Sequence, residues 1–281
     1  MALLGDFGNR SVILLAPSNR DRTTRFRNVW SDNSLHDQLQ AEMQRLRGRI
    51  YLGDGAIRPG DLSIDGRHST LADDQSWHLL LLDEKGNIAG CARYRVHPPL
   101  ARFEDLGVAT SALARSTQWA SAFRTAVEEE LRGARKLGFP YVEMGGWAIA
   151  EHFRGTRHFL LSVLASYAFV RLIPGAFAIC PATERNGSAA VLRRMGGRLF
   201  EMSTTPIPAY FDARYGCQMQ MLRFDARQSP LGYEENVQQL MARLIECPVI
   251  CANPSGPRKT QNDFALPSHN SKSLGAIATA A

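Results

Sequence analysis

The stretch Tyr141-Val-Glu-Met-Gly-Gly-Trp-Ala-Ile-Ala-Glu-His-Phe-Arg-Gly-Thr-Arg-His158 decides the fold of this chain. It begins as an apolar strand that Gly145 and Gly146 interrupt, and glycine inside a strand often marks a bulge or a close approach of the backbone. A short basic turn follows, and residues 158–171 are then apolar and free of glycine and proline, which predicts a helix. Because a second apolar strand comes next, at 176–180, the order predicts one βαβ unit with a parallel pair of strands.

The basic turn, Arg154-Gly-Thr-Arg157, lies directly ahead of the predicted helix. The free N–H groups and the dipole of a helix N-terminus both favour an anion at that place. The turn therefore indicates a phosphate site, although a plain βαβ unit with surface arginines would explain the turn equally well.

The composition of the 281 residues is that of an ordinary globular protein, with 44% hydrophobic and 21% charged residues. The formal net charge of +6 suits a polyanionic ligand, but no basic run is dense enough to indicate nucleic acid. No apolar run reaches the roughly 18 residues of a membrane span, and the first residues lack the apolar core of a secretory signal. Five widely spaced cysteines lack metal-site spacing. We therefore expect a cytoplasmic protein with reduced thiols, no metal, no membrane span and no nucleic-acid partner.

The rest of the chain supplies strands and helices on both sides of the βαβ unit. Apolar residues at three- and four-residue spacing predict helices, and short apolar runs bounded by turn residues predict strands. The expected elements are an edge strand at 11–16, a helix at 34–51, a hairpin of strands at 76–83 and 88–97, a helix at 119–137, a short helix at 189–195, strands at 198–202 and 216–224, and a last helix at 233–246.

With these elements in this order, residues 34–224 resemble the GNAT superfamily of acyl-CoA N-acyltransferases. In that family, the turn that cradles the pyrophosphate of the acyl carrier reads Arg/Gln-x-x-Gly-x-Gly/Ala. The corresponding residues here are Arg154-Gly-Thr-Arg-His-Phe159, so Arg157 and Phe159 stand where the family prefers small residues. The later run Asn186-Gly-Ser-Ala-Ala-Val-Leu resembles the family's N-x-x-A-x-x-L/Y segment, with Leu192 in place of a tyrosine that often serves as general acid.

The resemblance implies an α/β fold: a mixed, mostly antiparallel, twisted sheet flanked by helices, with the parallel βαβ unit at the acyl-carrier site. It divides the chain into an N-terminal strand and loop at 1–33, a GNAT acyltransferase domain at 34–224 and a C-terminal helix at 225–251. Residues 252–281 are rich in Pro, Ser, Asn, Gly and Ala with few large apolar groups, which predicts a disordered tail.

A narrower likeness is to the autoinducer synthases, which make acyl-homoserine lactones, and to the long-chain N-acyl amino acid synthases. Asp73-Asp74 ahead of a strand, followed by Gly90-x-x-Arg93, is similar to the acids and the arginine of that branch. Glu143 stands where the branch has a strand glutamate in an E-x-x-R pattern, but the arginine position is Gly146 here.

These likenesses imply an N-acyltransferase that moves an acyl group from acyl-CoA, acetyl-CoA or an acyl carrier protein to the amine of a small molecule, such as an amino acid or its derivative. A homodimer is compatible with this assignment. The altered turn and the missing tyrosine leave an alternative open: a non-catalytic module that binds or senses acyl-CoA on the same scaffold.

Amide formation requires a neutral amine, so a carboxylate within reach of the bound ammonium acts as general base. Backbone N–H groups at a strand bulge then stabilise the oxyanion. Glu143 is the expected base, with a structural pairing to an arginine as the alternative, and Glu151 is the second candidate. The expected carrier-binding residues are Trp147, Ala148, Ile149, Arg154, Gly155, Thr156, Arg157, His158 and Asn186. The expected substrate-binding residues are Asp73, Asp74, Trp77 and Arg93.

Overall fold

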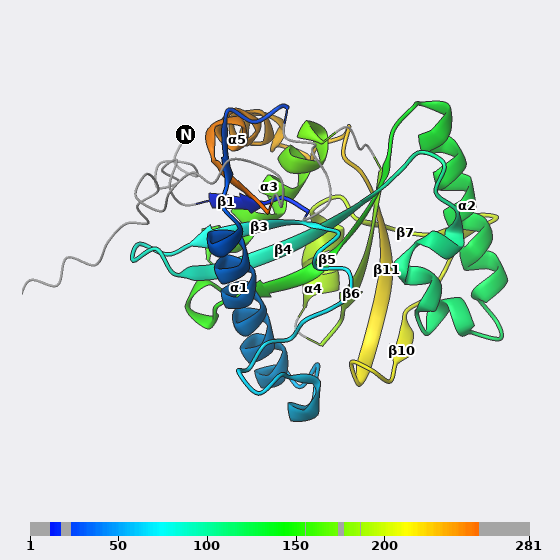
Figure 1. The fold of residues 1–281 in the computed structure, drawn as a ribbon. Helices are drawn as coiled ribbons and strands as arrows, with labels where there is room; N and C mark the ends of the chain where they lie inside the picture. Colours follow the sequence, from blue (N-terminus) through cyan, green and yellow to red (C-terminus); the bar gives the residue numbers. More distant parts are fainter. Residues whose placement is uncertain (1–11, 18–23, 155, 174–176, 186, 253–281) are drawn as a thin grey trace, which may run out of the picture.

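One large mixed sheet organises the structure, a computed structural model that describes residues 12–17, 24–154, 156–173, 177–185 and 187–252 (Figure 1). Within these residues the sheet has ten strands in the order β10-β11-β6-β5-β4-β3-β1-β12-β2, with β7 also paired to β11. The strands are β1 Val12–Leu15, β2 Asn28–Ser31, β3 Trp77–Leu82, β4 Ile88–His97, β5 Tyr141–Ile149, β6 Phe177–Thr183, β7 Arg198–Leu199, β10 Tyr210–Asp212, β11 Cys217–Asp225 and β12 Pro248–Cys251, and β8 Glu201–Met202 pairs with β9 Thr205–Pro206 in a separate ribbon.

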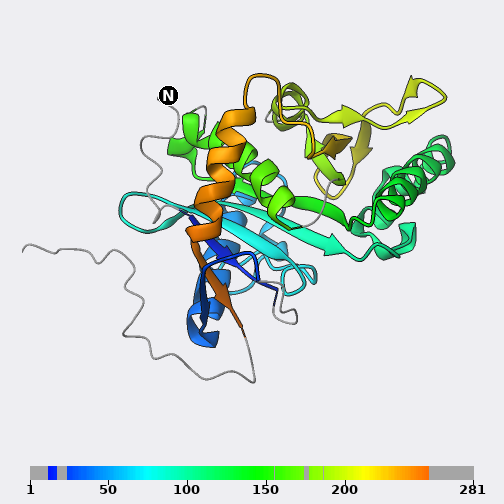
Figure 2. The ribbon, with the colours of Figure 1, turned by 90° about the horizontal axis from the view of Figure 1, so that it is seen from above.

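Helices cover both faces of this sheet. The helices are α1 Asn33–Gly53, α2 Ala120–Lys136, α3 Arg157–Leu172, α4 Ser188–Arg194 and α5 Glu234–Glu246, with 3₁₀ turns η1 Pro59–Asp61, η2 Phe103–Asp105, η3 Gly107–Thr110, η4 Leu113–Arg115 and η5 Glu151–Phe153. Helices α3, α4 and α5 share one apolar core with the strands, and α1 and α2 pack into two further cores on the opposite face. The second view shows the two layers of helices with the sheet between them (Figure 2).

The central βαβ unit has the predicted form. Strand β5 runs into α3, and β6 returns parallel to β5. Strands β3, β4 and β5 are mutually antiparallel, as are β6, β11 and β10. The expected fold class is therefore confirmed. The structure adds two further parallel pairs, between β1 and β12 and between β12 and β2.

The two strands of the parallel pair separate soon after they begin. Tyr141, Val142 and Glu143 of β5 pair with 177–179 of β6, and the described residues show no pairing between the strands beyond that point. A bulge lies just beyond, where the β4–β5 register shifts between Cys91 and Arg93 and Gly146 takes φ +61°. The predicted glycine bulge is thus confirmed, and it leaves an open wedge between the second halves of β5 and β6.

The ends of the chain join the same sheet, which corrects one expectation. The strand expected at an edge, β1, lies inside the sheet between β3 and β12. Strand β12 completes this region with the fully buried Val249 and Ile250, and it follows directly after α5. Strands β1 and β2, which precede residue 34, and strand β12, which follows residue 224, therefore belong to the main sheet. The expected tail lies outside the described residues after 252.

Truncation at two neighbouring positions tests this arrangement. Removing all residues after Glu246 deletes β12 and the burial of Val249 and Ile250, each of which contributes about 1.5–3 kcal/mol. We expect the melting temperature to fall by at least about 6 °C, since about 1 kcal/mol corresponds to roughly 2–4 °C in a domain of this size. Truncation after Ala252 is the control, because the composition of the following residues predicts no docked structure. Equal melting temperatures for the two truncated proteins would contradict the role of β12.

Candidate functional site

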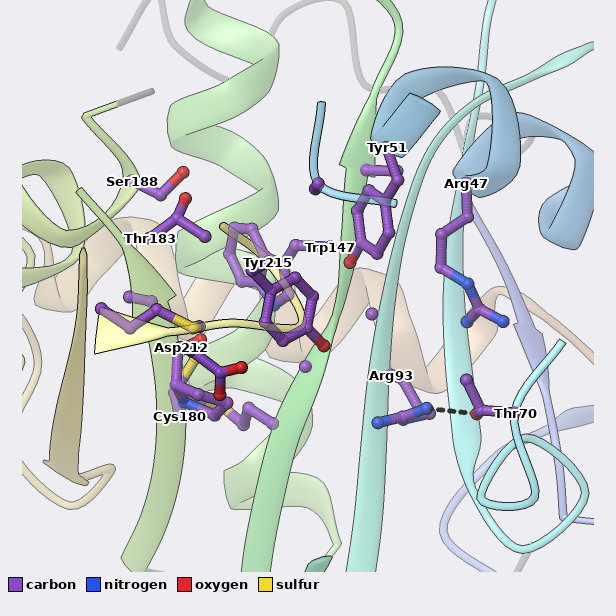
Figure 3. Close-up of a pocket in the computed structure, with 18 of the residues that line it drawn as sticks. Arg47, Tyr51, Thr70, Arg93, Trp147, Cys180, Thr183, Ser188, Asp212 and Tyr215 are labelled. Atoms are coloured by element: carbon purple, nitrogen blue, oxygen red, sulfur yellow. Dashed lines mark hydrogen bonds between the residues drawn. The ribbon is translucent and has the colours of Figure 1, made fainter. Parts of the chain in front are cut away.

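A cavity of about 1130 Å³ lies in the wedge between β5 and β6 (Figure 3). Its walls come from α1, the loop that follows residue 67, and strands β4, β5, β6, β10 and β11. Three carboxylates line it, those of Asp54, Glu143 and Asp212. Seven arginines line it as well, namely Arg47, Arg93, Arg95, Arg115, Arg154, Arg185 and Arg214. The excess of cationic groups in a concave site favours an anionic ligand.

The second half of β5 forms one wall of the cavity. Trp147, Ala148 and Ile149 all line it, as expected. On the other side, Ala148 and Ile149 pair with Cys91 and Gly90 of β4. The edge of β5 that faces β6 is unpaired along this stretch of the described chain, so it offers backbone donors and acceptors to a ligand in the wedge.

A buried ion pair joins α1 to the loop ahead of β3. The side chains of Arg47 and Asp73 are each only 1% exposed, and Nη2 of the arginine lies 2.5 Å from Oδ2 of the aspartate. Thr70 donates to both carboxylate oxygens at 3.0 Å, through its backbone N–H and its hydroxyl. Burial alone would raise the pKa of Asp73, but these hydrogen bonds and the Arg47 charge outweigh it and hold the pKa well below its usual range.

This pairing corrects the expectation that Asp73 binds the acceptor amine. Arg47, Gln44 and Thr70 occupy its two carboxylate oxygens, and Asp73 lies behind the cavity wall. Arg93 reaches the same cluster, because its Nη1 donates to the Thr70 hydroxyl at 2.6 Å (Figure 3). Arg93 lines the cavity as expected, with part of its guanidinium facing the open space.

Two other expected substrate residues lie elsewhere. Asp74 is exposed and accepts a hydrogen bond from Gln40 of α1. Trp77 is a core residue, 1% exposed, with its ring 5.5 Å from that of Phe26 and 5.6 Å from that of Phe169. Neither residue lines the cavity.

The carboxylate of Glu143 is fully engaged. His97 donates to it through Nε2 at 2.8 Å, and the backbone N–H groups of Gly107 and Val108 donate at 2.9 and 2.8 Å. Burial raises the pKa of Glu143, but the His97 contact and the two backbone hydrogen bonds outweigh it, so the pKa is lowered. The alternative pairing with an arginine is corrected, because Glu143 binds His97 and anchors the turn η3 to β5. Glu143 also lines the cavity, and its role as general base stays a prediction. Glu151 is exposed in η5 and does not line the cavity.

The basic turn after β5 is tied to the end of α1. Arg154 lines the cavity and binds Asp54 with both of its terminal nitrogens, each at 2.9 Å. Arg185 donates to the carbonyl oxygens of Asp54 and Gly55 at 3.0 and 2.9 Å. The Thr156 hydroxyl donates to the carbonyl of Phe153 and does not line the cavity.

The remaining carrier-binding candidates cannot be placed from side-chain contacts. Gly155 and Asn186 lie outside the described residues, and so do the side chains of Arg157 and His158. Within the described ranges, no group of three or more His, Cys, Asp or Glu side chains is arranged to hold a metal ion. In the same ranges, no helix combines the length and apolar character that a membrane crossing needs.

Several cavity residues carry no signal in the sequence. The rings of Tyr51, from α1, and Tyr215, from the turn before β11, both extend into the cavity (Figure 3). Burial raises the pKa of Tyr51, and the neighbouring Tyr215 raises it further, so its hydroxyl keeps its proton. Leu192 lines the cavity where the resembling family often has a tyrosine. His68 and Asp212 also line it.

Gly146 of β5 lies close to an arginine of helix α1. A Cβ atom at Gly146 would lie 3.3 Å from Nη1 of Arg47 and 3.1 Å from Cβ of Arg93. The guanidinium of Arg47 thus occupies the space beside β5 where a side chain at position 146 would begin.

Comparison with known proteins locates the fold. No protein-family profile and no curated protein sequence matches the chain. Among solved structures, the chain is similar to BjaI, a CoA-dependent acyl-homoserine lactone synthase whose structure contains SAM and isopentyl-CoA. The TM-score is 0.50 and the sequence identity is 15%, over 89% of this chain and 95% of that chain. For MesI, another CoA-dependent acyl-homoserine lactone synthase, the TM-score is 0.49 at 13% identity over 82% and 95% of the two chains. The similarity to BjaI shows that this chain shares its fold with that synthase.

The contact between Gly146 and Arg47 predicts a substitution that destabilises the protein. Gly146→Ala places a Cβ against Arg47 and Arg93, and it also puts a side chain at φ +61°, which costs roughly 1–2 kcal/mol for a non-glycine residue. We expect urea unfolding to show a loss of at least about 1 kcal/mol. Gly145→Ala is the matched control, because a Cβ at that position would lie 3.6 Å from Nη2 of Arg93, which is an ordinary van der Waals contact. A Gly146→Ala protein as stable as the control would contradict this account.

The lowered pKa of Glu143 predicts that the stability of the protein depends on pH. Its folded pKa is lowered, so its contribution is fully present above the unfolded pKa near 4.3 and is lost as the pH falls through the folded pKa. Glu143→Gln removes this contribution and leaves one backbone N–H poorly paired, at a cost of about 1–3 kcal/mol. Urea unfolding from pH 7 to pH 3 should therefore show the gap between parent and variant shrinking at acid pH. A gap that stays constant over this range would mean that the Glu143 charge does not stabilise the fold.

Proposed function

We propose that this protein is an N-acyltransferase that moves an acyl group from a phosphopantetheine thioester to the amine of a small molecule. The observation that carries the proposal is the wedge between β5 and β6, with an unpaired strand edge on one side and an arginine-rich cavity within it. An extended, amide-containing chain that ends in phosphates fits such a wedge, because its amides pair with the strand edge and its phosphates meet the cations.

The phosphates of the carrier are assigned to the end of the wedge near α3. Arg154 lies there, and the N-terminus of α3 follows it in the chain, with Gly155, Thr156, Arg157, His158 and Asn186 as further contacts in this proposal. In the free protein Arg154 is bound by Asp54, so the phosphates would compete with that carboxylate. The proposed acyl donor is acyl-CoA, and an acyl carrier protein would present the same phosphopantetheine group.

The acyl group itself is assigned to the apolar side chains behind Trp147. Met144, Trp147 and Leu192 belong both to the cavity and to a small apolar pocket on the α3 side of the sheet. Backbone N–H groups around 147–149 would polarise the thioester carbonyl and stabilise the oxyanion, whereas the N–H of Ala150 is donated to the carbonyl of Ala89. The thioester would then lie beside the bulge at Gly146, close to Arg47.

The acceptor is assigned to the side of the cavity that Arg93 and Tyr215 line. Arg93 offers a guanidinium whose other nitrogen is fixed by Thr70, which suits the carboxylate of an amino acid or an amino-acid derivative. The BjaI structure holds SAM, which is such a derivative, together with an acyl-CoA. This parallel supports an acceptor that carries both an amine and a carboxylate.

A non-catalytic module that binds acyl-CoA is the second candidate. Two observations favour it: the carboxylate of Glu143 is taken by three donors, and Leu192 stands where a tyrosine could protonate the leaving thiol.

One assay distinguishes the transferase from the non-catalytic module. Purified protein is incubated with a panel of acyl-CoA thioesters and amines, with release of free thiol and formation of amide followed by a thiol reagent and mass spectrometry. Release of thiol with formation of amide supports the transferase, whereas calorimetric binding without either product supports the module.

The phosphate assignment predicts the effect of removing charge from the turn. Arg154→Ala combined with Arg157→Ala should weaken binding of CoA at least about tenfold, because each charge-assisted contact contributes roughly 1.5–3 kcal/mol. Isothermal titration calorimetry measures the affinity. Arg27→Ala is the matched control, since Arg27 pairs with Glu246 away from the cavity. An unchanged affinity in a folded double variant would remove the turn from the proposed phosphate site.

A further inference from the structure

One histidine differs from the other buried histidines of the described chain. His36, His78 and His97 each have a ring nitrogen hydrogen-bonded, to the carbonyl of Ala16, to the carbonyl of Asp73 and to Glu143 respectively. His68 is 5% exposed and lines the cavity. Its Nδ1 atom has no hydrogen-bond partner among the described residues, as is also true of Nδ1 in His36 and His78, but the His68 ring lacks the hydrogen bond at Nε2 that those two rings make. A buried ring nitrogen without a partner is uncommon in folded proteins and calls for an explanation.

The backbone of His68 is firmly held, although its ring is not. Its N–H donates to the carbonyl of Gln44 at 3.1 Å, and its carbonyl accepts from Nε and Nη2 of Arg47 at 3.2 and 2.5 Å. The ring lies against Tyr51, with 5.5 Å between ring centroids. Helix α1 therefore positions the imidazole at the cavity wall without using either of its nitrogens in a contact to itself.

The same arginine connects His68 to the bulge of β5. Arg47 binds the carbonyl of His68 on one side, and its Nη1 lies 3.3 Å from the Cβ position of Gly146 on the other. One guanidinium thus lies between the backbone carbonyl of His68 and Gly146 of β5. The imidazole lines the same cavity as Arg93 and Tyr215, on whose side the acceptor is proposed to bind.

The charged surroundings keep this imidazole neutral. Burial lowers the pKa of His68, and the positive charges of Arg47 from α1 and of Arg214 from the turn before β11 lower it further. Asp73 and Asp61 act in the opposite direction, and the net shift is downward. The ring of Tyr51 carries no charge at neutral pH. A neutral imidazole is the form that accepts a proton.

The carboxylates that line the cavity have hydrogen-bond partners of their own. The role of general base is therefore open to another group. Glu143 and Asp54 are both engaged, by three donors and by Arg154. Asp212 is the remaining carboxylate of the lining, and it lies across the cavity near Cys180 (Figure 3). It accepts a hydrogen bond from the backbone N–H of Arg214.

We propose that His68 is the general base of the acyl transfer and removes a proton from the ammonium group of the bound acceptor. This assignment rests on the proposed function. The proton passes to a ring nitrogen of His68, and the neutral amine attacks the thioester carbonyl. A C–N bond forms, the C–S bond breaks, and the leaving thiolate takes the second proton that the nitrogen loses. The products are an amide and a free thiol, and His68 returns its proton to solvent.

The test compares pH profiles of thiol release for the parent and His68→Gln. General-base catalysis is worth about 10²–10⁴ in rate, so kcat at pH 7 should fall by about a hundredfold or more, while calorimetric affinity for CoA stays unchanged. In the parent, kcat/KM should decline below an apparent pKa under 6.5. That limb should vanish in the variant, whose rate should rise instead with the pKa of the free amine.

Three further variants make the assignment specific. His152→Gln removes an exposed imidazole that does not line the cavity, and it should leave kcat unchanged. Added imidazole should restore part of the activity of His68→Ala, which a purely structural role would not allow. Asp212→Asn tests the competing carboxylate, and it should keep the acid limb of the parent profile. The circular dichroism spectrum of each variant checks its fold.

The outcomes separate the two proposals. An active parent with a slow His68→Gln variant, a lost acid limb and rescue by imidazole supports the assignment. An active parent with a fully active His68→Gln variant, or with an acid limb lost only in Asp212→Asn, overturns the role of His68 and leaves the acyltransferase standing. A parent that binds CoA and releases no thiol with any acceptor overturns the proposed function, and the role of His68 with it.

Discussion

The buried ion pair between Arg47 and Asp73 is the interaction on which the site depends. Each group alone would be costly to bury, and removing one partner of such a pair typically costs about 3–5 kcal/mol because the other charge is left uncompensated. Here the cost is offset by further hydrogen bonds from Gln44 and Thr70 and to the carbonyl of His68. The pair fixes the loop after residue 67 on α1, and the loop in turn supplies one wall of the cavity. It also places a guanidinium beside the bulge of β5.

Much of the fold follows from local patterns. The local signals are the periodicity of α1, the apolar run of α3 without glycine or proline, the hairpin of β3 and β4, and the glycine bulge in β5. Each is contained within about twenty residues, and all of them predict the structure correctly. The position of β1 and the existence of β12 do not follow in this way. Strand β12 has four residues and pairs with segments more than 200 residues away, so its stability comes from tertiary contacts that no short window displays.

The site is predictable where its residues are neighbours in sequence along one element. Trp147, Ala148 and Ile149 reach the cavity because β5 carries them there. Glu143 lies on the same strand, but the donors that engage it are mainly backbone N–H groups of η3. Backbone donors leave no trace in the side-chain sequence, so their contact with Glu143 could not be foreseen. The pairing of Asp73 with Arg47 and the placement of Tyr215 likewise depend on the packing of separate elements.

The contact between Arg154 and Asp54 has a consequence for how binding at one end of the cavity affects the other end. Asp54 caps the C-terminal end of α1, and the same helix carries Tyr51 and Arg47 one and two turns earlier. A phosphate that took Arg154 would leave Asp54 without its partner and close to a new negative charge, which would push the end of α1 away from the turn. Because a helix moves largely as a rigid body, binding of phosphates at the carrier site would shift Tyr51 and Arg47 on the acceptor side of the cavity. Binding of the carrier and binding of the acceptor would then be coupled through α1.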